Sequence, residues 1–374
     1  MEDLTLVAVV AVALFFDFTN GFHDTANSIA TSVSTRALAP RPAVLMAAIL
    51  NVAGAFVSFE VAATIAKDIV EPGVITLDIV LAGLVGAITW NLITWYMGLP
   101  SSSSHALIGG VAGSAIAAGG FDVVQWNGLV EKVAIPSLLA PLFGIVTAAA
   151  LMLALMWIVR RRAPGLVNRV FRRLQLISGA FVAFTHGQND AQKTMGIIAL
   201  ALVASGHLAP DFDRPPIWVI VSAALAMGLG TYAGGWRIIK TLGTRIAKLD
   251  PPRGFAAQTA TAGILWTTAH YGFPVSTTHT VSGSVLGAGA TRRLNAVRWG
   301  VAGNILVAWV LTIPAAGLVG AGMEVITRLP AGDALVFALA AVIATVAFGA
   351  RSWQTRRVTH AQDELAAWAT PAGS

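Results

Sequence analysis

The chain has 374 residues, of which 56% are hydrophobic and only 11% are charged. Soluble domains carry about 25% charged residues, so the composition excludes a soluble globular protein and indicates an integral membrane protein. The backbone must satisfy its own hydrogen bonds in lipid, and the long apolar runs favour an all-α protein; the absence of cysteine excludes disulfides and thiolate metal sites.

A helix needs about 20 mostly apolar residues to cross the hydrocarbon core. The sequence predicts about eleven such segments (ten to twelve), over residues 4–33, 42–66, 76–97, 101–119, 134–158, 174–204, 216–236, 254–271, 274–290, 299–322 and 331–350. The fourth, eighth and ninth are short and border Pro- or Ser/Thr-rich turns, so we expect broken or re-entrant helices there. No signal peptide is expected, because Glu2 and Asp3 stand where a basic start should be.

Basic residues concentrate in short cytoplasmic loops. If the N-terminus is outside and the sides alternate, all but five of the 24 Lys and Arg residues fall in cytoplasmic segments. We therefore expect an N-terminus outside and a C-terminus inside, in a plasma membrane such as the bacterial inner membrane. Topology explains the net charge of +6, and we expect no nucleic-acid partner. The sequence leaves open a homo-oligomer and a cytoplasmic regulatory protein.

Two pairs of motifs repeat along the chain. Residues 20–28 match residues 186–194 at an offset of 166, and residues 100–105 match residues 274–279 at an offset of 174. An odd number of predicted spans separates the copies, so the repeats must be inverted, as in many secondary transporters. We expect a first inverted repeat over 1–130 and a second over 174–290, joined by a connecting span with a basic loop over 131–173. C-terminal spans over 291–350 and a cytoplasmic tail over 351–374 follow.

The second pair of motifs is rich in hydroxyl groups directly after a proline. Proline suits the first turn of a helix, so each turn can open a helix whose free N–H groups face a bound anion. The candidate substrate-binding hydroxyls are Ser102, Ser103, Ser104, Ser276, Thr277 and Thr278. The alternative is ordinary helix capping by Ser and Thr.

The first pair of motifs places one carboxylate, Asp24 or Asp190, in the middle of an apolar segment. A charge at that depth is a functional hypothesis by default. An ionised carboxylate beside an anion site needs a cation or a proton, and amide oxygens add ligands for a hard cation. The candidate substrate and coupling-ion ligands are Asp24, Asn27, Asn189 and Asp190, with Thr194 as a further substrate ligand. A monovalent cation is compatible with them, and we expect no resident metal or cofactor.

Lys193 breaks the symmetry, because its counterpart is Asn27. It could neutralise Asp190, contact the anion, replace a bound cation, or form a purely structural ion pair. Histidines flank all four motifs and are candidates for a proton relay or for ordinary polar packing: His23, His105, His186 and His279. Asp17 lies two helical turns before Asp24 and could line an access path for cations.

Together, the four motifs resemble the inorganic phosphate transporter family over about residues 5 to 350. The resemblance implies phosphate symport driven by a cation gradient, with inverted repeats that converge on one site. Carried over by position, it implies ligands of phosphate and its coupling ions at Asp24, Asn27, Ser103, Ser104, Asp190, Thr277 and Thr278. Many members have Gly-Ala-Asn-Asp-Val-Ala-Asn in both acidic motifs, whereas here His23 precedes the first Asp and Lys193 replaces the last Asn. The coupling cation, sodium or proton, therefore stays open.

The leading hypothesis is a symporter that imports inorganic phosphate with a cation, and not an enzyme. Members of this fold also include a sulfate carrier, so a sulfate or other oxyanion permease is the alternative. An anion channel would not need buried carboxylates. An intramembrane hydrolase would need one catalytic triad, whereas both halves carry a nearly complete copy of the motifs.

Overall fold

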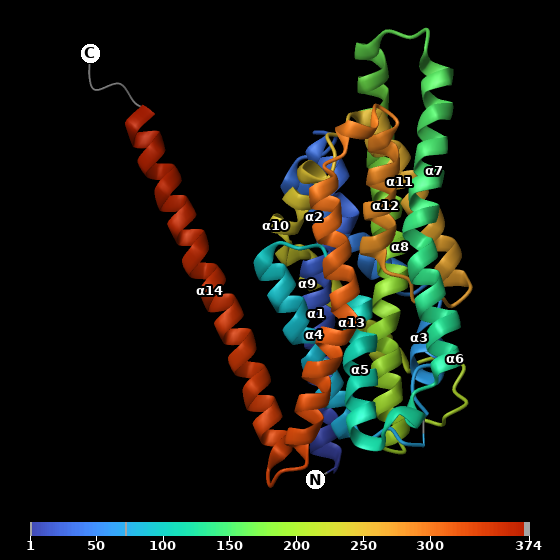
Figure 1. Cartoon of the computed structure of the whole chain (residues 1–374), viewed down its shortest axis with the longest axis vertical. Coiled ribbons are helices and arrows are strands. Elements are labelled where there is room, and N and C mark those ends of the chain that lie inside the picture. Colours follow the sequence, from blue (N-terminus) through green and yellow to red (C-terminus); the bar gives the residue numbers. More distant parts are fainter. Residues whose placement is uncertain (1, 72, 370–374) are drawn as a thin grey trace.

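The computed structural model of the chain describes residues 2–71 and 73–369, and every regular element in these two ranges is helical (Figure 1). This confirms the all-α prediction. In chain order the elements are α1 (Glu2–Ser34), α2 (Pro40–Gly54), α3 (Glu60–Lys67), α4 (Leu77–Met97), α5 (Ser103–Gly119), η1 (Phe121–Val123), α6 (Trp126–Gly128), η2 (Leu129–Ala134), α7 (Ile135–Val159), α8 (Pro164–Ala204), α9 (Ile217–Ala233), α10 (Trp236–Lys240), η3 (Thr241–Arg245), α11 (Pro251–His270), α12 (Thr277–Ala290), η4 (Leu294–Ala296), α13 (Trp299–Thr327) and α14 (Gly332–Ala369).

The stretch expected as one span over 42–66 is two helices, α2 and α3, separated by residues 55–59. A helix start leaves backbone N–H groups without an intrahelical partner. Here the side-chain oxygen of Gln192, on α8, accepts hydrogen bonds from the N–H groups of Val61 (2.9 Å) and Ala62 (3.3 Å). A distant glutamine thus stabilises a break that the apolar pattern does not reveal.

Three other boundaries differ from the sequence prediction. α8 begins at Pro164, ten residues before the predicted span, because proline is well tolerated at the first helical position. The segment between the predicted spans 216–236 and 254–271 contains the short helices α10 and η3, which are bent by 63° from α9. The predicted tail continues α14 without a break up to Ala369, and residues 370–374 of that tail lie outside the described residues.

In the described part of the chain, five helices are long and apolar enough to cross a membrane on their own, or six if α9 and its bent continuation count as one. α5 and α12 have only 17 and 14 residues. At 1.5 Å per residue they are shorter than a hydrocarbon core of about 30 Å. The total of eleven spans therefore stays a prediction.

The helices pack in matching groups. α13 packs along α4 and α5, and α7 packs in the same way along α11 and α12. α1 packs on α9, and α8 packs on α2. α1 and α8 also contact each other. In Figure 1, α5 and α12 lie in opposite halves of the molecule along its long axis. The N-terminus lies at one end of that axis, and the connection between α7 and α8 lies at the other.

Local details also recur at the offset of the second motif pair, which is 174 for the two glycines, or one residue short of it, at 173 for the two tryptophans. The helices α4 and α11 are each followed by a glycine, Gly98 or Gly272, with φ of +71°, a left-handed conformation that glycine adopts without strain. The indole N–H groups of Trp126 and Trp299 donate to the backbone carbonyls five residues earlier, at 2.9 and 3.0 Å. Segments related by this offset thus share local backbone and side-chain details.

Candidate functional site

The acidic motifs lie in the middle of α1 and α8, and the hydroxyl motifs form the starts of α5 and α12. Ser102 and Ser276 are the N-caps of α5 and α12: their side chains accept hydrogen bonds from the backbone N–H groups of His105 (3.2 Å) and His279 (3.3 Å). Capping thus explains these two predicted ligands structurally. Capping also fixes the next two hydroxyl residues, Ser103 and Ser104 or Thr277 and Thr278, in the first turn of each helix. The positive end of the helix dipole lies at this turn.

Those next hydroxyls contact the two buried carboxylates. On the α1 side, Ser103 donates a hydrogen bond to Asp24 Oδ2 at 2.6 Å, and Thr278 donates to Asp24 Oδ1 at 3.4 Å. On the α8 side, Thr277 donates to Asp190 Oδ1 at 3.2 Å. Ser103 and Thr277 occupy equivalent positions in the two hydroxyl motifs, so each carboxylate meets the equivalent residue of its own half.

The residues three positions after the carboxylates reach into the opposite half. Asn27 donates from Nδ2 to Thr278 Oγ1 at 2.9 Å, and Lys193 donates from Nζ to Ser104 Oγ at 2.5 Å. Lys193 also forms an ion pair with Asp190 and donates to the backbone carbonyl of Val275 at 3.1 Å. The four motifs therefore form a single reciprocal network. Its side chains are at most 4% exposed, and low polarity strengthens every charged contact within it.

Two histidines belong to this network, and two do not. His23 Nδ1 lies 2.7 Å from Asp24 Oδ1, and His186 Nε2 lies 3.1 Å from Asp190 Oδ2. The other pair, His105 and His279, pack ring against ring with centroids 4.7 Å apart. Both approach Ser137 of α7 instead of a carboxylate, at 2.6 Å from its hydroxyl and 3.5 Å from its carbonyl.

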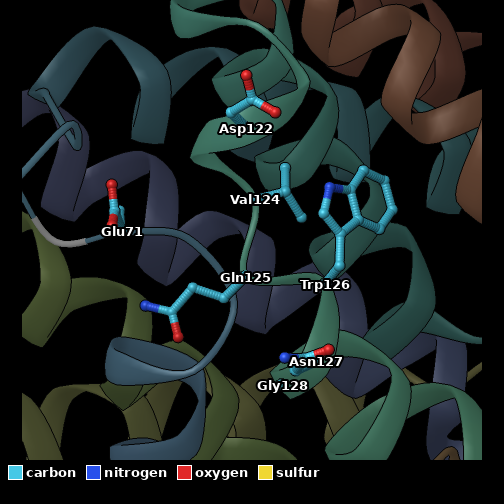
Figure 2. A pocket seen from close by; sticks show the side chains of 7 residues that line it. All are labelled: Glu71, Asp122, Val124, Gln125, Trp126, Asn127 and Gly128. Atoms are coloured by element: carbon cyan, nitrogen blue, oxygen red, sulfur yellow. The ribbon is translucent and has the colours of Figure 1, made fainter.

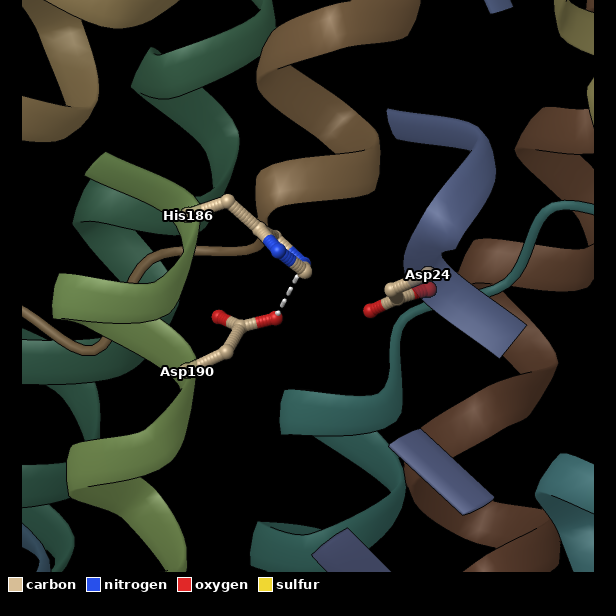
Figure 3. Close-up of side chains that lie close together, drawn as sticks. All are labelled: Asp24, His186 and Asp190. Carbon is tan, nitrogen blue, oxygen red and sulfur yellow. Dashed lines mark ion pairs between the residues drawn. The ribbon is translucent and has the colours of Figure 1, made fainter. Parts of the chain in front are cut away.

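The carboxylates of Asp24 and Asp190 point toward each other across the gap between α1 and α8, with His186 beside them (Figure 3). One ligand atom from each of the three residues lies within 4.8 Å of the others. Carboxylate oxygens and an imidazole nitrogen can hold a cation. Within the described residues, the side-chain oxygens of Asn27 and Asn189 have no hydrogen-bond partner, and both residues are buried.

Two predicted ligands are not connected to the network by hydrogen bonds. Neither side-chain atom of Asn189 has a hydrogen-bond partner among the described residues, and the same is true of Thr194 Oγ1. Both side chains are completely buried on α8, next to Asp190 and Lys193 in sequence.

Several residues that were not predicted from the sequence hold the network in place. Thr94 and Ser101 contact His23 Nε2 at 3.2 and 3.3 Å, and Asn51 contacts His186 Nδ1 at 3.1 Å. Polar residues inside the apolar stretches, such as Asn51 and Thr94, are a signal that could have indicated them. Within the second acidic motif, Gln188 donates to Ser58 Oγ in the break between α2 and α3, a structural contact rather than a ligand contact.

A hollow of about 390 Å³ lies elsewhere, around η1 and α6. Figure 2 shows the side chains that line it, which include Glu71, Asp122 and Trp126. None of the predicted site residues lies in its lining.

Comparisons with known proteins agree with the motifs. The model of the phosphate transporter family matches residues 20–320. A Mycobacterium bovis protein named "Probable low-affinity inorganic phosphate transporter" is 51% identical over 86% of this chain and 77% of its own length. Proteins with the same name from Rhizobium meliloti and Bacillus subtilis are 50% and 47% identical over 84% of this chain and 94% and 95% of theirs.

A solved structure, named "The sodium-dependent phosphate transporter", resembles the chain with a TM-score of 0.79. The match covers 87% of this chain and 99% of the other, at 25% identity.

Proposed function

The chain belongs to the phosphate transporter family, whose transported substrate is phosphate, and we propose that it is a secondary active symporter that imports inorganic phosphate together with a cation, sodium or proton. The chain is a multi-pass membrane protein with several apolar helices. The observation that carries the proposal is the reciprocal network, in which two helix starts and two buried carboxylates from both halves meet.

The first turns of α5 and α12 supply the anion-binding groups. Free N–H groups and the helix dipole favour an anion at a helix start. The hydroxyl donors around it are Ser103, Ser104, Thr277 and Thr278. The Lys193 ammonium adds a positive charge in contact with Ser104. In this proposal phosphate binds between the two helix starts and accepts hydrogen bonds now made to Asp24 and Asp190.

The carboxylates supply the coupling-ion site. Phosphate entering beside Asp24 and Asp190 would add negative charge to a buried site, so a cation must enter with it. Asp24, Asp190 and His186 present their ligand atoms within 4.8 Å of one another, and the free oxygens of Asn27 and Asn189 are close in sequence to the two carboxylates. The structural relative is named as sodium-dependent, whereas a proton would need only one of these carboxylates.

We also propose the inverted-repeat architecture, with about eleven segments, an external N-terminus and a cytoplasmic C-terminus. Support comes from the matching packing groups and from the paired tryptophan and glycine details described above. Arg160, Arg161 and Arg162 lie at the turn between α7 and α8, at the opposite end of the molecule from the N-terminus (Figure 1). Basic residues favour the cytoplasmic side.

The test is uptake of radiolabelled phosphate by purified protein in liposomes, with sodium and proton gradients imposed separately. At least one gradient must drive phosphate above its equilibrium level. Equilibration without accumulation would indicate a channel. Stronger competition by unlabelled sulfate than by unlabelled phosphate would indicate the alternative oxyanion permease.

A further inference from the structure

Asp17 is another buried carboxylate, and the network described above does not use it. It lies on α1 two turns before Asp24, and its side chain is completely buried. Asp24 and Asp190 each accept hydrogen bonds from hydroxyl groups. Neither oxygen of Asp17 has a hydrogen-bond partner among the described residues.

The side chains around Asp17 that could hydrogen-bond to it are polar and uncharged. Its polar neighbours are Thr194 on α8 and Asn20 on α1, and neither makes a well-formed hydrogen bond with it. The hydroxyl oxygen of Thr194 and the amide oxygen of Asn20 are themselves without partners in the described chain. α1 and α8 thus bring together four buried oxygens without hydrogen-bond partners: both carboxylate oxygens of Asp17, the amide oxygen of Asn20 and the hydroxyl oxygen of Thr194.

The charged groups that act on Asp17 from α8 are Asp190, which repels it, and Lys193, which attracts it. Lys193 already pairs with Asp190. On its own helix, the ionisable neighbours are His23 and Asp24, which pair with each other. The central parts of α2, α4 and α9, which also pack on α1, contain no ionisable residue over 42–54, 79–95 and 217–231.

The remaining helices that touch α1 meet it at Phe22 or later in the chain, and they include α14, whose Phe348 ring packs on the Phe22 ring. α10 and η3 approach it at residues 22–34, with Arg237, Lys240 and Arg245 on that side. α5 and α12, which carry His105 and His279, reach it through Ser103 and Thr278. α11, which carries Arg253 and His270, reaches it through the bond from Gln258 to Ser32. Asp17 therefore has no cation of its own.

The geometry favours a proton over a metal ion at this place. Hard metal ions collect six or more oxygen ligands, and transporters usually supply some of them from unwound backbone. α1 and α8 are unbroken helices here, so their carbonyls are already used. A proton needs only one carboxylate oxygen and one acceptor, and it neutralises a buried carboxylate that lacks an ionic partner.

We propose that Asp17 is the proton-carrying residue of the symport cycle, at a site separate from the Asp24, His186 and Asp190 cluster. A proton from the solution on the side of the N-terminus binds the carboxylate and gives a carboxyl group, which then donates to Thr194 or Asn20. The proton leaves to the opposite solution when the transporter changes its facing, and the carboxylate is regenerated. This inference rests on the proposed symport and adds a proton site at Asp17 to the cation site proposed at Asp24, His186 and Asp190.

The test compares Asp17→Asn with the wild type in liposomes. Asparagine imitates the protonated carboxyl but cannot release a proton. With a pH gradient of about one unit, alkaline inside, the wild type should accumulate radiolabelled phosphate up to about tenfold for each coupled proton. Asp17→Asn should fall to an accumulation ratio of about one, while exchange of labelled for unlabelled phosphate stays within about twofold of the wild type. Asp17→Glu, which keeps an ionisable group, should retain accumulation.

Each other outcome overturns one specific claim. If Asp17→Asn still accumulates phosphate under the pH gradient, or loses exchange as well while remaining folded, Asp17 is not the proton carrier. If Asp17→Asn is not recovered from membranes, Asp17→Glu decides. If Asp17→Glu exchanges phosphate normally but no longer accumulates it, the inference is contradicted as well. A wild type driven by sodium alone removes the inference but leaves the proposed symport standing, whereas a wild type that no gradient drives removes the symport itself.

Discussion

Lys193 on α8 donates a hydrogen bond to Ser104 in the first turn of α5, with 2.5 Å between Nζ and Oγ. Its counterpart Asn27, on α1, makes the equivalent contact to Thr278 in the first turn of α12. Each acid-bearing helix is therefore connected to the hydroxyl turn of the other half. A transporter that changes its facing must break or exchange such contacts, which places the moving parts at these four helices.

Replacing Lys193 with Asn should make transport depend on added sodium. The ammonium is 1% exposed and neutralises Asp190, and removing one partner of a buried ion pair costs about 3–5 kcal/mol. A sodium ion can restore the lost charge beside the new amide. We expect uptake at low sodium to fall at least about tenfold and to recover as sodium is raised. Lys193→Met, which supplies no oxygen ligand, is the control that sodium should not rescue; equal sodium response in both variants would contradict this account.

Replacing Asp190 with Asn should abolish cation-coupled uptake while the protein still inserts. The carboxylate holds Lys193 and accepts from Thr277, and an amide cannot balance the ammonium. Uptake under each gradient, compared with the amount of folded protein by size-exclusion chromatography, measures the effect. Full-rate uptake with unchanged cation dependence would remove Asp190 from the site.

Neighbouring serines in the first hydroxyl turn should have separable effects. Ser102→Ala removes an N-cap, which costs about 1 kcal/mol of stability and should lower the Tm with little change in KM. Ser103→Ala removes the 2.6 Å hydrogen bond to Asp24; bonds to charged groups are worth about 1.5–3 kcal/mol. We expect a KM for phosphate raised about tenfold or more. In the second turn, Ser276→Ala should likewise lower mainly the Tm and Thr277→Ala should raise mainly the KM. A larger KM effect from Ser102→Ala or Ser276→Ala would mean that the capping serines, not their neighbours, bind phosphate.

Gln192→Leu should affect stability but not phosphate recognition. The side chain accepts from the N–H groups of Val61 and Ala62 at the start of α3, and leaving buried donors unsatisfied costs about 1–3 kcal/mol each. The Tm should fall, while KM for the residual active protein stays within about twofold. A KM shift without a Tm change would mean that Gln192 touches substrate.

The sequence predicted the helical class, most helix positions and the residues that meet at the centre. These features depend on composition, apolar length and internal repetition, which a single sequence displays. Asp24, Asn27, Asp190 and Lys193 could be selected because polar residues in an apolar segment are costly and two copies coincide.

Long-range contacts explain what the sequence did not predict. The break between α2 and α3 depends on Gln192, which is near residues 61 and 62 only in space. His105 and His279 follow the hydroxyl turns closely, yet helix geometry directs both side chains toward Ser137 and away from the carboxylates. Ser102 and Ser276 each belong to a run of hydroxyl residues, and only the position of each helix start makes them caps.

The most direct measurement is an anomalous difference map from crystals grown with arsenate, which has the tetrahedral shape and charge of phosphate and contains an anomalous scatterer. The account predicts one arsenic peak between the first turns of α5 and α12, within hydrogen-bond distance of Ser104, Thr277 or Thr278 and near Lys193. A fully occupied peak elsewhere, for example in the hollow beside Glu71 and Trp126, with none between the two helix starts, would contradict it.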